Sequence, residues 1–141
     1  MSTPSPAGRA PTILFACVHN AGRSVAAKVL TEHYARGRVA VLSAGSEPAD
    51  AINPVVAAVL ARRGLSAEAE SPSRLSVETV GEADVVVTMG CGETCQFVPG
   101  RRYEDWELDD PAGQPAEVVE SIVSAIDVRV RALLVELGVE P

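Results

Sequence analysis

Residues 12–24 read Thr12-Ile13-Leu14-Phe15-Ala16-Cys17-Val18-His19-Asn20-Ala21-Gly22-Arg23-Ser24. The apolar run before Cys17 is typical of a strand buried in a parallel sheet. A helical pattern begins near Arg23, so the thiol lies where a strand ends and a short loop turns into a helix. A helix N-terminus carries unpaired backbone N–H groups and the positive end of the helix dipole. This stretch therefore predicts a place suited to an oxyanion.

Two side chains in this loop indicate chemistry as well as binding. The field of a helix N-terminus favours the thiolate form of Cys17, which is the nucleophilic form. Arg23 adds a planar set of donors that matches a tetrahedral oxyanion. The alternative is a buried cysteine that only ends a strand, with an exposed arginine nearby. The Cys-x5-Arg-Ser spacing between strand and helix favours a reaction centre for phosphate-like substrates.

Strand and helix patterns alternate along the rest of the chain. Strands are expected at residues 11–17, 39–45 and 84–89 and near Arg102-Tyr103, and helices at residues 23–36, 53–63, 76–79 and 116–138. Between the later elements, residues 90–115 look irregular, and such a long loop in a compact domain is usually functional or mobile. The alternation predicts an α/β fold: a doubly wound, four-stranded parallel sheet with helices on both faces and the ligand at the carboxyl ends of the strands.

Length and charge narrow the class of protein. The 141 residues suit one domain, which we place at residues 11–141, after a disordered lead at residues 1–10 that lacks an apolar signal core. The net charge of −7 argues against a nucleic-acid partner. No apolar run approaches the ~20 residues of a membrane span. We expect a cytoplasmic protein, and in that compartment its three cysteines would normally be reduced.

Several motifs together resemble a known family. Cys17-x5-Arg23-Ser24, Ser43-Ala44-Gly45 and Asp110-Pro111 resemble the low-molecular-weight tyrosine phosphatases, and more closely the arsenate reductases built on that fold. Residues 86–92 and 103–113 are also similar to these reductases, and the resemblance covers residues 11–138. Phosphatases of this fold carry aromatic residues after the Asp-Pro pair, whereas this chain has Ala112-Gly113.

The resemblance implies roles for the residues of the loop. Cys17 would attack arsenate, with phosphate and sulfate as competing oxyanions. The remaining oxygens would be held by the Arg23 side chain and by the backbone N–H groups of Val18, His19, Asn20, Ala21, Gly22 and Arg23. Ser24 would donate a hydrogen bond to the thiolate. Asn20 would fix the loop through backbone groups and Ser43.

Two neighbours of the loop have competing interpretations. Asp110 would protonate the leaving oxygen, which requires a protonated carboxyl during the reaction; the alternative is an aspartate that only starts a turn before Pro111. The side chain of His19 is expected to point away from the cradle, so we do not assign it as a base. Lys28 stands where several relatives place a glutamate that helps to hold a potassium ion. Its ammonium would then hydrogen-bond Asn20 and Ser43 in place of the ion; the alternative is an ordinary solvated lysine.

Cys91 and Cys95 supply the redox part of the hypothesis. In the reductases that this chain resembles, a second cysteine attacks the adduct that the nucleophilic cysteine forms with arsenic, and arsenite is released. A third cysteine then attacks the resulting disulfide and carries it to the surface. Gly90 and Gly92 flank Cys91 and would allow the backbone to move. The spacing of Cys91 and Cys95 is shorter than in the well-known thioredoxin-coupled pattern, so their order of attack stays open. The cysteines and histidines lack a zinc spacing, and we expect no metal or cofactor.

Three functions follow as alternatives. The first is a monomeric, cytoplasmic arsenate reductase recharged by thioredoxin, which the three cysteines favour. A variant of it uses a mycothiol and mycoredoxin system and needs only Cys17. The second is a phosphotyrosine or phosphoester phosphatase in which Cys91 and Cys95 protect Cys17 from oxidation. The third is an oxyanion sensor on an inactive phosphatase fold, against which Cys17, Arg23 and Asp110 argue.

Overall fold

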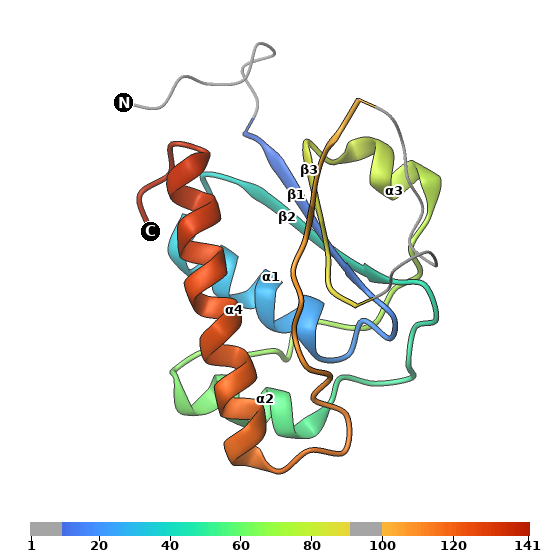
Figure 1. The fold of residues 1–141 in the computed structure, drawn as a ribbon, viewed down its shortest axis with the longest axis vertical. Coiled ribbons are helices and arrows are strands. Elements are labelled where there is room, and N and C mark those ends of the chain that lie inside the picture. The colour runs from blue at the N-terminus through green and yellow to red at the C-terminus, as the bar shows by residue number, and fades with distance from the viewer. Residues whose placement is uncertain (1–9, 91–99) are drawn as a thin grey trace.

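The computed structural model describes residues 10–90 and 100–141. Its four parallel strands are β1 (Thr12–Cys17), β2 (Ala40–Gly45), β3 (Val85–Thr88) and β4 (Arg102–Asp105), in the spatial order β2-β1-β3-β4 (Figure 1). The helices are α1 (Arg23–Ala35), α2 (Pro54–Arg62), α3 (Val77–Glu82) and α4 (Ala116–Glu136). The predicted fold class is confirmed. The predicted lead lies almost wholly outside the described residues, as do Cys91 and Cys95.

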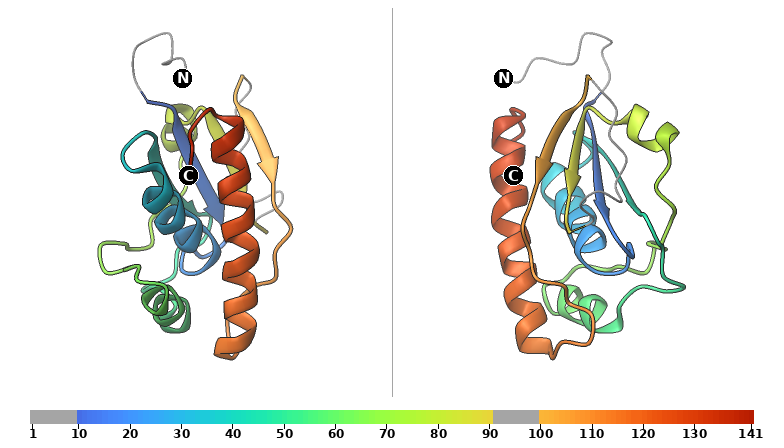
Figure 2. Two further views of the ribbon diagram at one scale, coloured as in Figure 1. Left: turned by 90° about the vertical axis from the view of Figure 1, so that its left-hand side faces the viewer. Right: turned by 45° about the vertical axis from the view of Figure 1, so that its right-hand side comes forward.

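Helices cover both faces of the sheet, but unequally. α1, α2 and α4 lie on one face, and the short α3 lies on the other (Figures 1 and 2). β1 runs through the middle of the sheet, and its residues from Ile13 to Cys17 are all buried. A strand that is covered on both faces has no solvent side, which explains its unbroken apolar sequence. None of the helices in the described part of the chain is long and apolar enough to cross a membrane.

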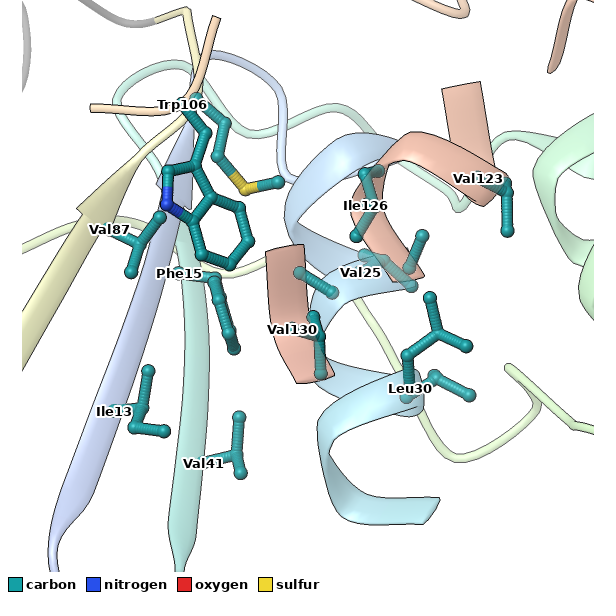
Figure 3. Packing of buried hydrophobic residues seen from close by; sticks show 14 of the residues in the cluster. Ile13, Phe15, Val25, Leu30, Val41, Val87, Trp106, Val123, Ile126 and Val130 are labelled. Carbon is teal, nitrogen blue, oxygen red and sulfur yellow. The ribbon is translucent and has the colours of Figure 1, made fainter. Parts of the chain in front are cut away.

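The larger core lies between the sheet and the helices α1, α2 and α4. Figure 3 shows strand side chains meeting helix side chains there: Ile13, Phe15, Val41 and Val87 face Val25, Leu30, Val123, Ile126 and Val130. Trp106, just after β4, closes the end of this layer with its ring centroid 5.7 Å from that of Phe15. This core fixes α1 against β1, and therefore fixes the loop that joins them.

The strand register brings the candidate residues to one edge of the sheet. Cys17, the last residue of β1, lies opposite Gly45, the last residue of β2. β3 runs parallel to β1 and ends beside it, with Ala16 opposite Thr88. The chain leaves β1 toward β2 on one side, while β3 pairs on the other side. The loop after β1 therefore lies at a switch point of the topology, where α/β sheets bind ligands.

Candidate active site

The loop from Cys17 to Gly22 turns its carbonyl oxygens toward a single neighbouring segment, residues 46–53. The carbonyls of residues 17, 18, 19 and 21 accept hydrogen bonds from the N–H groups of residues 46, 47, 49 and 53 at 2.8–3.2 Å. In a trans peptide the C=O and N–H point in opposite directions. The N–H groups that follow these carbonyls therefore face the inside of the loop. This arrangement forms a cradle of donors for an anion.

The first turn of α1 adds to this cradle. Gly22 precedes the helix without a side-chain hydrogen bond to the first turn, and that turn contains no acidic residue. Its N–H groups are therefore available to a ligand. Gly45 lets the loop pack closely, because a Cβ at this position would lie 2.5 Å from the Val18 carbonyl oxygen and 2.9 Å from the Asn20 nitrogen.

Two donors converge on the sulfur of Cys17, which is 2 % exposed. The backbone N–H of Asn20 donates to Sγ at 3.2 Å, and the Ser24 hydroxyl oxygen lies 2.9 Å from Sγ. The Ser24 oxygen also accepts from the side-chain amide of Asn20 at 2.7 Å. That contact leaves the hydroxyl hydrogen of Ser24 for the sulfur. Both groups therefore direct a donor hydrogen at the sulfur.

Ser73, a residue that the sequence analysis did not single out, holds the side chain of Asn20. Its backbone has a φ of +49°, a left-handed conformation that asparagine tolerates better than most residues. Its side-chain oxygen accepts from the N–H of Ser73 at 2.9 Å, and the Ser73 hydroxyl donates to the Ser43 carbonyl at 2.9 Å. The expected contact of Asn20 with Ser43 was therefore wrong. Ser73 lies between the two residues and bonds both of them.

Arg23 is the buried cation of the site, at 8 % exposed. One guanidinium nitrogen donates to the Leu108 carbonyl at 3.2 Å, and the other lies 4.0 Å from a carboxylate oxygen of Asp110. The backbone of Gly90, directly beyond the end of β3, runs beside the same guanidinium. Arg23 is thus oriented by segments that follow β3 and β4, although it begins α1.

Asp110 lies at the open side of the site. Its side chain is 54 % exposed, and one carboxylate oxygen accepts from the N–H of Ala112 at 3.0 Å, so the turn before Pro111 is real. The other oxygen faces Arg23. A hollow of about 150 Å³ is lined by Cys17, His19, Ala21, Gly22, Arg23, Ala49, Asn53, Asp110, Pro111 and Ala112. The hollow brings the predicted nucleophile, clamp and acid together, with room for a small tetrahedral anion.

The structure corrects the role that the sequence analysis gave to Lys28. Its ammonium lies 2.9 Å from Glu70 and 3.1 Å from Glu32, and in the described part of the chain these two carboxylates hold it rather than Asn20 or Ser43. Burial lowers the pKa of Lys28, but the hydrogen bonds to Glu70 and Glu32 outweigh it, so the pKa is raised above its ordinary value.

Other predicted residues fall at the rim or outside the described chain. His19 lies at the rim of the hollow, where its Nδ1 is 3.1 Å from the Glu47 carbonyl oxygen rather than in contact with Cys17. Cys91 and Cys95 belong to the undescribed residues, and their place in the relay stays a prediction. The sequence analysis missed Ser73, Leu108 and the segment 46–53. Each of them contacts the loop or Arg23 through backbone groups, which leave no side-chain signal in a sequence.

Known proteins are similar to this chain in sequence and in fold. Residues 12–140 match the family described as low molecular weight phosphotyrosine protein phosphatase. A putative arsenate reductase of Halobacterium salinarum is 34% identical over 129 residues, which cover 88% of this chain and 91% of that protein. The structure of a thioredoxin-dependent arsenate reductase of Corynebacterium glutamicum superposes with a TM-score of 0.83 and 41% identity, covering 94% of this chain.

This chain spans 64% of the length of the Corynebacterium chain. A further solved structure, titled an arsenate reductase in the phosphate binding state, has a TM-score of 0.78 and 27% identity, covering 90% of this chain and 98% of that one. Sequence, fold and the geometry of the Cys17 loop agree. The chain belongs to the low-molecular-weight phosphotyrosine protein phosphatase family, and within that family it groups with the arsenate reductases.

Proposed function

We propose that this protein reduces arsenate to arsenite, with Cys17 as the nucleophile. The observation that carries the proposal is the pair of donors on the buried sulfur, from Ser24 and from the Asn20 backbone, inside a loop that presents further N–H groups. Such a site stabilises both a thiolate and a tetrahedral oxyanion. Arg23 and Asp110 supply the charge and the proton that displacement at arsenic requires.

In the first step the Cys17 thiolate attacks arsenic, and a sulfur–arsenic bond forms. One oxygen leaves, and Asp110 gives it a proton so that it departs as water. Arg23 and the inward-facing N–H groups neutralise the charge of the oxygens that remain. Arsenic is still in its oxidised form at this point, held as a thiol ester on Cys17.

In the second step two electrons pass to arsenic. The thiolate of Cys91 attacks the sulfur of Cys17, a disulfide forms, and the sulfur–arsenic bond breaks with its electron pair on arsenic. Arsenite is released. Cys95 then attacks Cys91, which frees Cys17 and leaves a Cys91–Cys95 disulfide, and an external dithiol reduces that bridge. Three thiols and one external reductant therefore balance one turnover.

We propose thioredoxin as that reductant. The Corynebacterium relative is titled thioredoxin-dependent, and a relay of three cysteines ends in a disulfide of the kind that a protein dithiol reduces. A mycothiol and mycoredoxin system is the alternative, and in that case only Cys17 is required. The relay needs cysteines that start each cycle as thiols, which suits the cytoplasm, and one chain holds every group named here, which suits a monomer.

A phosphatase activity is the second candidate, because the same cradle, nucleophile and acid also serve phosphoryl transfer. The family to which the chain belongs is described by that activity. The hollow, however, has Ala49 and Ala112 at its edge, and these side chains give an aryl ring little to stack on. We therefore expect inorganic oxyanions to be better substrates than aryl phosphates.

The test compares these activities side by side. Arsenate-dependent NADPH oxidation is measured with thioredoxin and its reductase, and separately with mycothiol, mycoredoxin and mycothiol reductase. Hydrolysis of p-nitrophenyl phosphate is measured on the same preparation. Cys17→Ser should abolish every activity, because all of them need the thiolate. Efficient phosphate-ester hydrolysis without arsenate-dependent NADPH oxidation in either system would contradict the reductase function and support the phosphatase function.

A further inference from the structure

Residues 70–74, here called the strap, tie the chain between α2 and α3 to the Cys17 loop. The N–H of Gly45, at the end of β2, donates to the Ser73 carbonyl at 2.8 Å. The N–H of Ser73 in turn donates to the side chain of Asn20, and its hydroxyl donates to Ser43, both at 2.9 Å. The strap thus reaches Asn20, which donates its backbone N–H to the Cys17 sulfur and its side-chain amide to Ser24.

One ion pair anchors the other end of the strap. Lys28 of α1 lies 2.9 and 3.0 Å from the two carboxylate oxygens of Glu70, and the two side chains are 17% and 11% exposed. The second partner of Lys28, Glu32, is 50% exposed. Because the pair with Glu70 is screened little by water, it holds its geometry more firmly than a surface pair.

We propose that Glu70 and Lys28 are positioning residues for the nucleophile. Their ion pair holds the strap so that the Ser73 N–H sets the side chain of Asn20, and Asn20 then directs the Ser24 hydroxyl onto the Cys17 sulfur. The inference rests on the proposed role of Cys17 as the nucleophile. It adds two residues that touch neither the substrate nor the sulfur.

The contact with Ser73 determines which way the Asn20 amide group is oriented. Ser73 donates to the oxygen of the Asn20 amide, which leaves its NH₂ group to donate to Ser24. If Ser73 moved away, the Asn20 amide would lose the contact that specifies its orientation, and its left-handed backbone would lose a support. The chain from residue 65 to the end of the strap forms no helix, so the ion pair with α1 is one of the few side-chain anchors of the strap.

The experiment removes the anchor and reads the sulfur directly. Glu70→Ala deletes the carboxylate, and the milder Glu70→Gln keeps the shape of the side chain. Glu32→Gln is the matched control, because it removes the exposed partner of the same lysine without touching the strap. Alkylation of Cys17 by iodoacetamide is followed by mass spectrometry of its peptide at about pH 6 and about pH 9, the range in which thiols ionise. The kcat and the KM for arsenate are measured on the same variants.

We expect Glu70→Ala to lower the ratio of the alkylation rate at about pH 6 to the rate at about pH 9 by about 5-fold or more. The kcat should fall by a similar factor, and the KM should change less. Glu70→Gln should change the ratio in the same direction, Glu32→Gln should leave it unchanged, and Lys28→Arg should retain most of it. Lys28→Met combined with Glu70→Gln should cost no more than Lys28→Met alone, because both changes break one pair.

The proposal is overturned if the Glu70 variants lose thermal stability while the alkylation ratio and kcat stay unchanged. It is also overturned if Glu32→Gln lowers the alkylation ratio and kcat as much as the Glu70 variants do. A variant that does not fold is replaced by Glu70→Gln, whose unchanged alkylation ratio would overturn the proposal equally. The alkylation readout needs no arsenate. A protein that fails to reduce arsenate but shows the Glu70 effect therefore contradicts the proposed function and keeps the positioning role.

Discussion

Gly90 packs its backbone against the guanidinium of Arg23 so closely that a Cβ at this position would collide with one guanidinium nitrogen and lie 3.0 Å from Cζ. Its φ of +88° also belongs to the region that side chains other than glycine rarely adopt. Arg23 is thereby confined between this glycine and the carbonyl of Leu108. The orientation of Arg23, the proposed oxyanion clamp, therefore depends on the absence of a side chain at a residue that follows β3.

Gly90→Ala should displace Arg23 and weaken oxyanion binding. The new methyl group meets the flexible end of the arginine, so the side chain moves and the fold persists. We expect the KM for arsenate and the inhibition constant for phosphate each to rise by roughly 10-fold, as for the loss of one hydrogen bond to a charged group. Initial rates over a range of arsenate and phosphate concentrations measure both constants.

Gly100→Ala is the matched control for this change. Gly100 has a φ of +89°, but a Cβ there would meet no atom within 4 Å. Both variants therefore carry the same backbone strain, and only Gly90→Ala touches Arg23. Equal effects on KM in the two variants would show that strain, rather than displacement of Arg23, is the cause.

Ser24→Ala should slow the first chemical step. It removes the hydroxyl that links Asn20 to the Cys17 sulfur, and hydrogen bonds to charged groups contribute about 1.5–3 kcal/mol. We expect kcat to fall roughly 10- to 100-fold and alkylation of Cys17 at neutral pH to slow in parallel. Ser121→Ala, on the exposed side of α4, serves as the control. Normal alkylation with Ser24→Ala would contradict the role of this hydroxyl.

Asp110→Asn distinguishes the proposed role of Asp110 as a proton donor from its role in the turn. An asparagine oxygen can still accept from the Ala112 N–H, so the turn before Pro111 stays intact. Loss of the acid should slow turnover by about 10²–10⁴-fold, with little change in phosphate inhibition. The neighbouring Asp109→Asn is the control. An unchanged single-turnover rate would leave Asp110 with only its structural role.

Cys91→Ser and Cys95→Ser should fail at different stages. Without Cys91 the arsenic adduct on Cys17 has no internal thiol to resolve it, so arsenite release should stall within one turnover. Without Cys95 one equivalent of arsenite should still appear, and a Cys17–Cys91 disulfide should accumulate. Quenched single-turnover assays with mass spectrometry of the peptides distinguish the two. Normal cycling of both variants with mycothiol would instead support the small-thiol route.

Tyr34→Phe should reduce stability in a pH-dependent way. Tyr34 of α1 donates to Asp127 of α4 at 2.7 Å, and this hydrogen bond, followed by burial, raises the pKa of Tyr34 above its ordinary 10.0. Because folding favours the protonated form, the bond contributes fully below about pH 10 and is lost as the pH rises through the raised value. We expect Tyr34→Phe to cost about 1 kcal/mol at neutral pH.

Urea unfolding of the two proteins at several pH values checks this prediction. The difference in unfolding free energy should shrink above about pH 10, where tyrosine ionises. Tyr103 is present in both proteins, so its own ionisation cancels in the comparison. A difference that stays constant up to strongly alkaline pH would contradict the contribution assigned to this hydrogen bond.

The sequence by itself determined the order of the elements and the class of the reaction centre. Both depend on local patterns: an apolar strand, a loop with Cys17 and Arg23, and a helix that starts at once. Asn53 lies at the predicted start of the second helix, and its side chain accepts from two N–H groups of the first turn of α2. These signals survive folding because neighbours in the chain stay neighbours in the structure.

Only the tertiary structure decided which distant groups complete the site. Ser73 reaches Asn20 across 53 residues, and Leu108 reaches Arg23 across 85, and both do so with backbone atoms. Every residue other than proline has the same backbone donor and acceptor, so no residue type announces these contacts. The expectation for Lys28 failed for a related reason. Its partner depended on where the fold placed the carboxylate of Glu70, and no local pattern in the sequence contains that position.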